Sequence, residues 1–135
     1  MLKVFVLLAL FSAVHCGMKF QDYSDSLKAI AKQVHFQCQT FSGASEEEIN
    51  RAREGDFTGS EALKRFMACI WLLTGIVDEN LQTNAAVLEK MEPEIFRGKG
   101  VEIYSKCANK GKSSGGNIVD KVWVATLCVY EIQAE

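Results

Sequence analysis

The sequence predicts an all-α fold, a compact bundle of six short helices. Along most of the chain, apolar side chains recur at steps of three and four residues, which is the period of an amphipathic helix. No segment shows the two-residue alternation that is typical of a half-buried strand. The 135 residues include 48% apolar side chains, 24% charged side chains and a single proline, which is the composition of one ordinary globular domain.

The N-terminal segment has the pattern of a secretory signal peptide, residues 1–16. Lys3 precedes an apolar run over residues 4–13, and cleavage is expected after Cys16, which leaves a domain over residues 17–135. The run is shorter than the roughly 20 residues that a membrane-spanning helix needs. No later stretch reaches that length without a charge. We therefore expect a secreted, extracellular protein that does not insert stably into membranes.

The first helix of the domain is predicted to end near Gly43, where its apolar pattern stops. Ser45-x-x-Glu48 matches a capping box, which opens a short acidic second helix that runs to about Arg53. The apolar face of the first helix is formed by Leu27, Ile30, Ala31, Val34, Cys38 and Phe41.

The third helix is predicted to be the most buried element. Ser60 can cap its first turn, and residues 66–77 are apolar on nearly every side of the helix. Such a helix is surrounded either by a solid core or by a cavity, and the residue pattern alone favours the solid core. Its main apolar face is formed by Leu63, Phe66, Met67, Ile70, Leu73 and Val77.

The fourth helix is predicted to start at Thr83 or Asn84 and to stop before Pro93, which marks a turn. Two glycines then delay the fifth helix, which we centre on residues 101–109. The fourth helix carries the apolar residues Val87, Leu88 and Met91.

The glycine-rich segment 111–116 is predicted to be a loop, because glycine and serine favour turns. Asn117 can then cap the sixth and last helix. This helix runs through Val122, Trp123, Thr126, Leu127 and Tyr130.

Four cysteines remain after the predicted signal peptide: Cys38, Cys69, Cys107 and Cys128. An even number of cysteines in an exported chain indicates two disulfides. Three connectivities are possible, and the spacing alone does not choose among them. Joining the first to the second and the third to the fourth would tie neighbouring helices together, and each such bond stabilises by roughly 3 kcal/mol in the chain-entropy model.

Charge and histidine content exclude several functions. The 17 acidic and 15 basic side chains give a net charge of −2 and leave no basic stripe for the phosphates of a nucleic acid. Of the two histidines, one lies in the predicted signal peptide, so catalytic triads and histidine-rich zinc sites lack their residues. His35 and Cys38 have the spacing of metal ligands, but Cys38 is expected to be oxidised in a disulfide, and a lone histidine is more often a helix-surface residue. We expect no enzyme activity, no cofactor and no metal site.

Two local runs and the cysteine spacing carry a family resemblance. Residues 45–53 read SEEEINRAR and are followed by Gly55-Asp56, and residues 66–69 read FMAC and lead into GIVDE at 75–79. With the cysteine spacing, these runs resemble the insect odorant- and pheromone-binding proteins over essentially the whole domain. The resemblance implies a six-helix bundle around an apolar cavity, which carries small hydrophobic ligands through aqueous lymph.

The cysteine count resembles the four-cysteine, or minus-C, branch of that family. Most members have six cysteines, and the two extra positions, which are bonded to each other, correspond to Arg65 and Val119 here. Losing both cysteines together removes one disulfide and leaves no cysteine unpaired. Because that disulfide is missing, the cavity wall should be more flexible. The resemblance implies the disulfides Cys38–Cys69 and Cys107–Cys128.

The resemblance also indicates which side chains line the cavity. The first set surrounds Cys69, the second flanks Cys107 and Cys128, and the third comes from facing helices. In that order they are Met67, Ile70, Trp71 and Ile76; Val101, Tyr104, Ala125 and Val129; and Ala31, Val34, Leu88 and Met91.

One wall position has polar chemistry. Trp71 stands where relatives place a serine that hydrogen-bonds the polar head of a ligand, and its indole N–H can donate such a bond. Tyr104, Thr74 and Thr126 are alternative polar contacts, and each is as readily satisfied inside its own helix.

The expected function is therefore a non-enzymatic, secreted carrier of odorants, pheromones or related lipids in sensillum lymph, haemolymph or a gland secretion. The resemblance implies a monomer or weak homodimer, with a membrane chemoreceptor as a further partner. The alternative is a secreted helical protein that acts on membranes or protein partners through amphipathic helices. The net negative charge and the lack of a basic helix face argue against membrane action.

Overall fold

The computed structural model describes residues 25–91 and 98–134, and within them it is all-helical, as predicted. The predicted signal peptide and Pro93 lie outside this part of the chain. An isolated bridge between Val77 and Thr83 is the only strand-like pairing among the described residues. The helices described are α2 (Asp25–Ser42), α3 (Glu46–Arg53), α4 (Glu61–Leu73), α5 (Ala85–Met91), α6 (Gly100–Lys112) and α7 (Ile118–Ala134).

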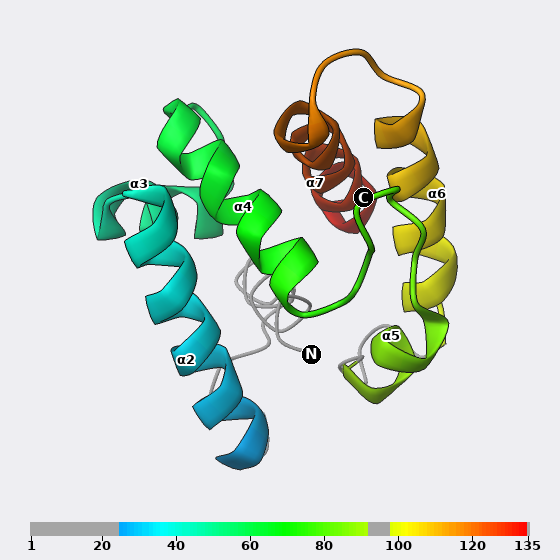
Figure 1. Cartoon of the computed structure of the whole chain (residues 1–135), viewed down its shortest axis with the longest axis horizontal. Coiled ribbons are helices and arrows are strands. Elements are labelled where there is room, and N and C mark those ends of the chain that lie inside the picture. Colours follow the sequence, from blue (N-terminus) through cyan, green and yellow to red (C-terminus); the bar gives the residue numbers. More distant parts are fainter. Residues whose placement is uncertain (1–24, 92–97, 135) are drawn as a thin grey trace.

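The third predicted helix, α4, runs through the middle of the molecule (Figure 1). It packs against α2 on one side and against α7 on the other, and α7 packs in turn against α6. The short helix α5 lies against α6. This order places the apolar surface of α4 between α2 and α7, which is why its apolar side chains from Leu63 to Trp71 are largely buried.

The end of α2 differs from the prediction in one residue. Phe41, assigned to the apolar face, is 72% exposed, and Ser42 is buried in its place. Ser42 lies four residues after the buried Cys38, whereas Phe41 is about 100° further round the helix. The Ser42 hydroxyl donates to the carbonyl of Gln39 at 3.4 Å and accepts from the N–H of Ala44 at 3.1 Å, so its burial leaves no polar group unpaired.

The predicted capping box at the start of α3 is present, and it has a second use. The Ser45 hydroxyl accepts from the N–H of Glu48 at 3.1 Å, and the Glu48 carboxylate accepts from the N–H of Ser45 at 3.2 Å. The same carboxylate accepts from the N–H of Ser60 at 3.1 Å and from its hydroxyl at 2.5 Å. The Ser60 hydroxyl and the backbone N–H groups of Ser45 and Ser60 hold the pKa of Glu48 below its usual value. One carboxylate thus fixes the starts of both α3 and α4.

The helix α4 is shorter than its apolar run predicted. It begins after Ser60, whose hydroxyl accepts from the N–H of Leu63 at 3.4 Å, and it ends at Leu73 rather than Val77. Gly75 adopts a left-handed backbone with φ of +76°, a conformation that ends a helix and that glycine adopts without strain. Leu73 lies in the last turn and is 47% exposed, so its assignment to the buried face is also wrong.

Asparagine side chains cap two of the last three helices. The Asn84 side chain accepts from the N–H of Val87 at 3.2 Å and so selects Asn84 over Thr83 as the cap of α5. The Asn117 side chain accepts from the N–H of Asp120 at 3.0 Å, and the Asp120 carboxylate accepts from the N–H of Asn117 at 3.1 Å. This reciprocal pair opens α7 where the sequence predicts a cap.

The prediction of a loop from residue 111 is wrong at its first two residues, because α6 continues to Lys112. Gly111 is buried inside the helix, and a Cβ built on it would strike the backbone carbonyl oxygen of Lys121 in α7. The same Cβ would lie 3.2 Å from the Lys121 carbonyl carbon and 3.3 Å from Cβ of Ala125. Gly111 therefore serves close packing of α6 on α7 rather than a turn.

Two disulfides connect the helices in pairs. Cys38–Cys69 joins α2 to α4 with a Cα–Cα distance of 5.6 Å, and Cys107–Cys128 joins α6 to α7 with a distance of 5.5 Å. These are the pairs that the resemblance implies. One crosslink therefore holds α2 against α4, and the other holds α6 against α7.

Candidate ligand-binding site

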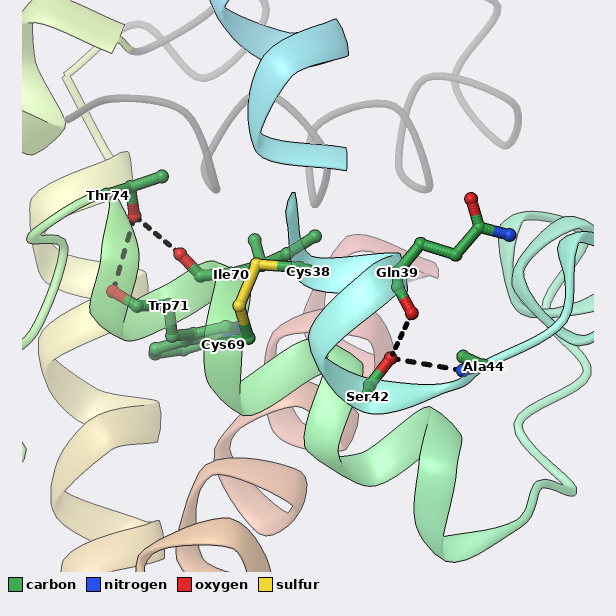
Figure 2. Close-up of a disulfide and its surroundings, with 8 residues drawn as sticks. All are labelled: Cys38, Gln39, Ser42, Ala44, Cys69, Ile70, Trp71 and Thr74. Atoms are coloured by element: carbon green, nitrogen blue, oxygen red, sulfur yellow. Dashed lines mark hydrogen bonds between the residues drawn. A yellow bond between two sulfur atoms is a disulfide. The ribbon is translucent and has the colours of Figure 1, made fainter. Parts of the chain in front are cut away.

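The site begins with the face of α4 next to the Cys38–Cys69 disulfide. Met67, Ile70 and Trp71 flank Cys69 on this helix, and all three are fully buried. Figure 2 shows the disulfide with Ile70, Trp71 and Thr74 around it. Because the disulfide fixes α2 against α4, it also fixes the direction in which these apolar side chains point.

Ile76, also fully buried, is positioned by the turn that follows α4. Its carbonyl accepts from the N–H of Asn84 at 2.8 Å, which closes the turn. Inside the turn, the Asp78 carboxylate accepts from the N–H groups of Asn80 at 2.8 Å and Gln82 at 3.0 Å. The Asp78 carboxylate, bonded to two backbone N–H groups, therefore organises the loop that follows Ile76.

The second predicted set comes from α6 and α7. Tyr104, Ala125 and Val129 are buried, and Val101 is half-buried. The rings of Tyr104 and Trp71 lie with their centroids 5.2 Å apart at an interplanar angle of 44°. This aromatic contact connects the α4 part of the site to the part on α6.

The third predicted set is less complete. Ala31 and Val34 of α2 and Leu88 of α5 are buried in the same hydrophobic cluster as the residues of α4, α6 and α7. The side chain of Met91 lies outside the described part of the structure. The structure thus brings eleven of the twelve predicted wall residues to one cluster or against it.

The polar groups in this cluster are of two kinds: threonine hydroxyls that are paired within their own helices, and an indole N–H without a described partner. Thr74 donates its hydroxyl to the Ile70 carbonyl at 2.8 Å, and Thr126 donates to the Val122 carbonyl at 2.8 Å, so both are satisfied within their own helices. The indole N–H of Trp71 is buried and has no hydrogen-bond partner among the described residues. An indole N–H can only donate, and leaving it unpaired costs about 1–3 kcal/mol. It is therefore a buried donor that no acceptor in the described part of the chain satisfies.

His35 is not the plain surface residue that the sequence suggested. Its side chain is 17% exposed, and its ring packs edge-on against Phe66 with centroids 5.4 Å apart. Its Nε2 lies 2.5 Å from a Glu46 carboxylate oxygen, and its Nδ1 lies 3.4 Å from Nη2 of Arg53. Burial lowers the pKa of the Arg53 guanidinium, and the Glu46 carboxylate acts in the opposite direction.

These contacts depend on the angle between α2 and α3, which sequence spacing does not provide. The fully buried Phe66, which the sequence assigned to the apolar face of α4 but not to the wall, lies under the His35 ring. The cluster of His35, Glu46 and Arg53 therefore closes the outer side of the α2–α4 contact.

Other kinds of site find no support in the described residues. Within them, no group of three or more histidine, cysteine, aspartate or glutamate side chains is placed to hold a metal ion. No described helix combines the length and apolar character that crossing a bilayer requires.

Comparison with known proteins decides the family. The model of the PBP/GOBP family matches residues 20–132. The chain belongs to this family. PBP/GOBP proteins are binding proteins for small hydrophobic ligands rather than enzymes, and the buried apolar cluster around Trp71 is consistent with that role.

One curated relative of this PBP/GOBP protein is the B1 protein of Tenebrio molitor. The two are 38% identical over 80 residues, which cover 58% of this chain and 62% of the relative. The match therefore spans less than two thirds of the relative's length. No solved structure matches the chain significantly.

Proposed function

We propose that this protein is a secreted carrier that holds one small hydrophobic molecule in its interior and moves it through an aqueous extracellular fluid. The residues in contact with the ligand would be those that surround the Cys38–Cys69 disulfide on α4 and the facing surfaces of α2, α5, α6 and α7. Membership of the PBP/GOBP family supports the proposal. The gathering of the predicted wall residues in one cluster supports it as well.

The observation that carries the proposal is the indole N–H of Trp71, which lies within that apolar cluster and has no hydrogen-bond partner among the described residues. A packed core gains nothing from a buried donor without an acceptor. A ligand that carries a carbonyl, ester, ether or hydroxyl oxygen would satisfy this donor while its hydrocarbon part contacts Met67 and Ile70. The preferred ligands would then be oxygen-bearing apolar molecules rather than plain hydrocarbons.

The expected affinity is moderate. Burying about a dozen CH₂ groups at ~0.8 kcal/mol each gives roughly 10 kcal/mol. Association costs several kcal/mol, so the net binding free energy corresponds to a dissociation constant in the micromolar range. Discrimination between neighbouring chain lengths would be shallow, because one methylene changes the free energy by only ~0.8 kcal/mol.

The finer assignments belong to the same proposal. We place the protein in the four-cysteine branch, with Arg65 and Val119 at the positions of the missing bridge. The Arg65 guanidinium donates to the Ser42 carbonyl at 3.1 Å, which offers a non-covalent tie between α4 and the end of α2. Secretion would follow from removal of residues 1–16, and delivery to a membrane chemoreceptor as a monomer or weak homodimer would complete the carrier role.

A probe-displacement experiment tests the proposal. The chain is produced in a eukaryotic secretory host and titrated with N-phenyl-1-naphthylamine, which fluoresces in apolar surroundings, and the probe is then displaced with long-chain alcohols, esters and terpenes. Saturable one-to-one binding without lipid is expected. Probe binding that appears only with phospholipid vesicles would contradict the carrier and support the membrane-active alternative.

Matched variants locate the site. Ile70→Trp and Met67→Trp add bulk to fully buried positions of α4 and should weaken probe binding. Leu73→Trp changes a half-exposed position of the same helix and should leave binding unchanged. Circular dichroism identifies variants that keep their helices. If both buried variants stay folded and bind the probe as well as the unchanged chain, these residues are not part of the wall.

A further inference from the structure

A groove lies on the outer side of the α6–α7 pair, away from the α4 residues of the proposed interior site, and of its lining residues only Cys128 and Ile132 belong to or pack against the buried cluster. Its volume is about 540 Å³, within the range of sites that bind small molecules. One side is formed by α6 and the other by the second half of α7. The residues that give it its chemistry are Lys106, Asn109, Lys110, Ser113, Glu131 and Ile132.

The α6 side of the groove is cationic and rich in donors. Lys106 and Lys110 are one helical turn apart, so their side chains leave the helix about 5–6 Å from each other. Neither ammonium group forms an ion pair with another described residue. Asn109, between the two lysines in the sequence, adds a side-chain amide, and Ser113, after the second lysine, adds a hydroxyl. This side therefore offers two free positive charges and two neutral hydrogen-bonding groups to one anion.

The α7 side supplies apolar surface. Ile132 is half-buried and packs against the hydrophobic core, and Cys128 of the Cys107–Cys128 disulfide also faces the groove. Glu131 is the one carboxylate in the lining. With two lysines and one glutamate, the lining has a net positive charge next to an apolar strip, which complements an anionic head joined to an alkyl chain.

We propose that this groove binds a small amphiphilic carboxylate, with its carboxylate between Lys106 and Lys110 and its alkyl chain along Cys128 and Ile132. The size of the groove favours a small molecule over a protein partner. The groove is lined by seven residues, whereas a stable protein interface uses about 20–30 residues on each side. The site would thus be a second ligand site, occupied independently of the interior.

Residue-resolved NMR with octanoate tests this site in the chain secreted from a eukaryotic host. Octanoate is expected to shift saturably the amide signals of the exposed groove residues Lys106, Asn109, Lys110, Ser113 and Glu131, and neutral octanol is expected to leave these signals unchanged. Replacing both lysines, K106Q with K110Q, should weaken octanoate binding there by about fivefold or more, because both cationic partners of the carboxylate are removed. Glu131→Gln should strengthen it, because the opposing carboxylate charge is removed.

A matched control uses two other lysines of the same region. Lys99 precedes α6 and Lys112 ends it, both are exposed, and neither lines the groove. The K99Q with K112Q variant loses the same charge and should bind octanoate as the unchanged chain does. Equal weakening by both double variants would show a general charge effect and overturn the site.

Three other outcomes would also overturn the proposal. The first is that octanoate does not shift the amide signals of the groove residues. The second is that octanol shifts them as much as octanoate does. The third is that a glutamate-rich peptide displaces octanoate at a lower concentration than other carboxylates need. Binding in the interior is read separately, from the methyl signals of Met67 and Ile70. Failure of the groove therefore leaves the carrier function untouched, and failure of the carrier leaves the groove testable.

Discussion

Gly111→Ala gives the sharpest test of how α6 and α7 pack. In an isolated helix this change stabilises by about 1 kcal/mol, because alanine is the better helix former. In this protein the new methyl group would strike the Lys121 carbonyl oxygen and would crowd Cβ of Ala125 at 3.3 Å. The Cys107–Cys128 disulfide lies about one turn away and keeps the two helices from separating.

The magnitude follows from two opposing contributions. Adding a methyl group to a packed contact costs about 1–3 kcal/mol, and a backbone neighbour that cannot rotate away favours the upper value. Subtracting about 1 kcal/mol for the helix preference leaves a net destabilisation of about 2 kcal/mol. The close approach of the two helices therefore reverses the sign that helix propensity alone predicts.

Urea unfolding followed by circular dichroism measures this difference. The control is Gly115→Ala, in the open loop between the helices, where an added Cβ meets nothing within 4 Å. That variant should change stability by no more than about 1 kcal/mol. If Gly111→Ala proves as stable as the unchanged chain or more so, with the same urea dependence, the account of the α6–α7 contact is wrong.

Three further predictions concern caps, crosslinks and the site. Glu48→Gln should lower the free energy of unfolding at pH 7 by about 0.3–1 kcal/mol, because the amide oxygen can keep the capping hydrogen bonds and only the negative charge at the helix N-terminus is lost. The folded pKa of Glu48 is below its ordinary value of 4.5, so this contribution is present above pH 4.5 and is lost as the pH falls through the folded pKa. Equal acid unfolding profiles for Glu48→Gln and the unchanged chain would contradict the prediction. Replacing Cys107 and Cys128 with serine opens a loop with a sequence separation of 21 and should cost roughly 3 kcal/mol in urea unfolding, and unchanged stability would refute the crosslink's role. Trp71→Phe should weaken binding of an ester by about tenfold while leaving a hydrocarbon of the same length unaffected, as measured by probe displacement, and equal effects on both would rule out the indole donor.

The features of the fold that the sequence predicts well are local ones. The capping box at Ser45 and the caps at Ser60 and Asn117 are formed within a few residues, so their spacing in the sequence is enough to find them. Gly111 was misjudged because its role depends on a residue of another helix. Phe41 was misjudged because three-residue and four-residue steps from Cys38 fit the pattern equally, and packing selects between them.

In the candidate site, too, the features that depend on other parts of the chain were not predictable from the sequence. Family resemblance predicts that the side chains around Cys69 line a cavity; the structure shows that they are buried, and their contact with a ligand stays a prediction. The unpaired state of the Trp71 N–H required knowledge of every neighbouring acceptor, which a sequence does not contain. The groove next to Lys106 and Lys110 was missed for a related reason, since its second wall belongs to a different helix.

A crystal structure of the protein, produced in a eukaryotic secretory host and crystallised with an ester of about a dozen carbons, tests the central claim most directly. The proposed function predicts the alkyl chain in contact with Met67 and Ile70, and the ester carbonyl oxygen at about 3 Å from Nε1 of Trp71. An interior filled entirely by the protein's own side chains, with the ester absent or bound only on the outer surface, would contradict it.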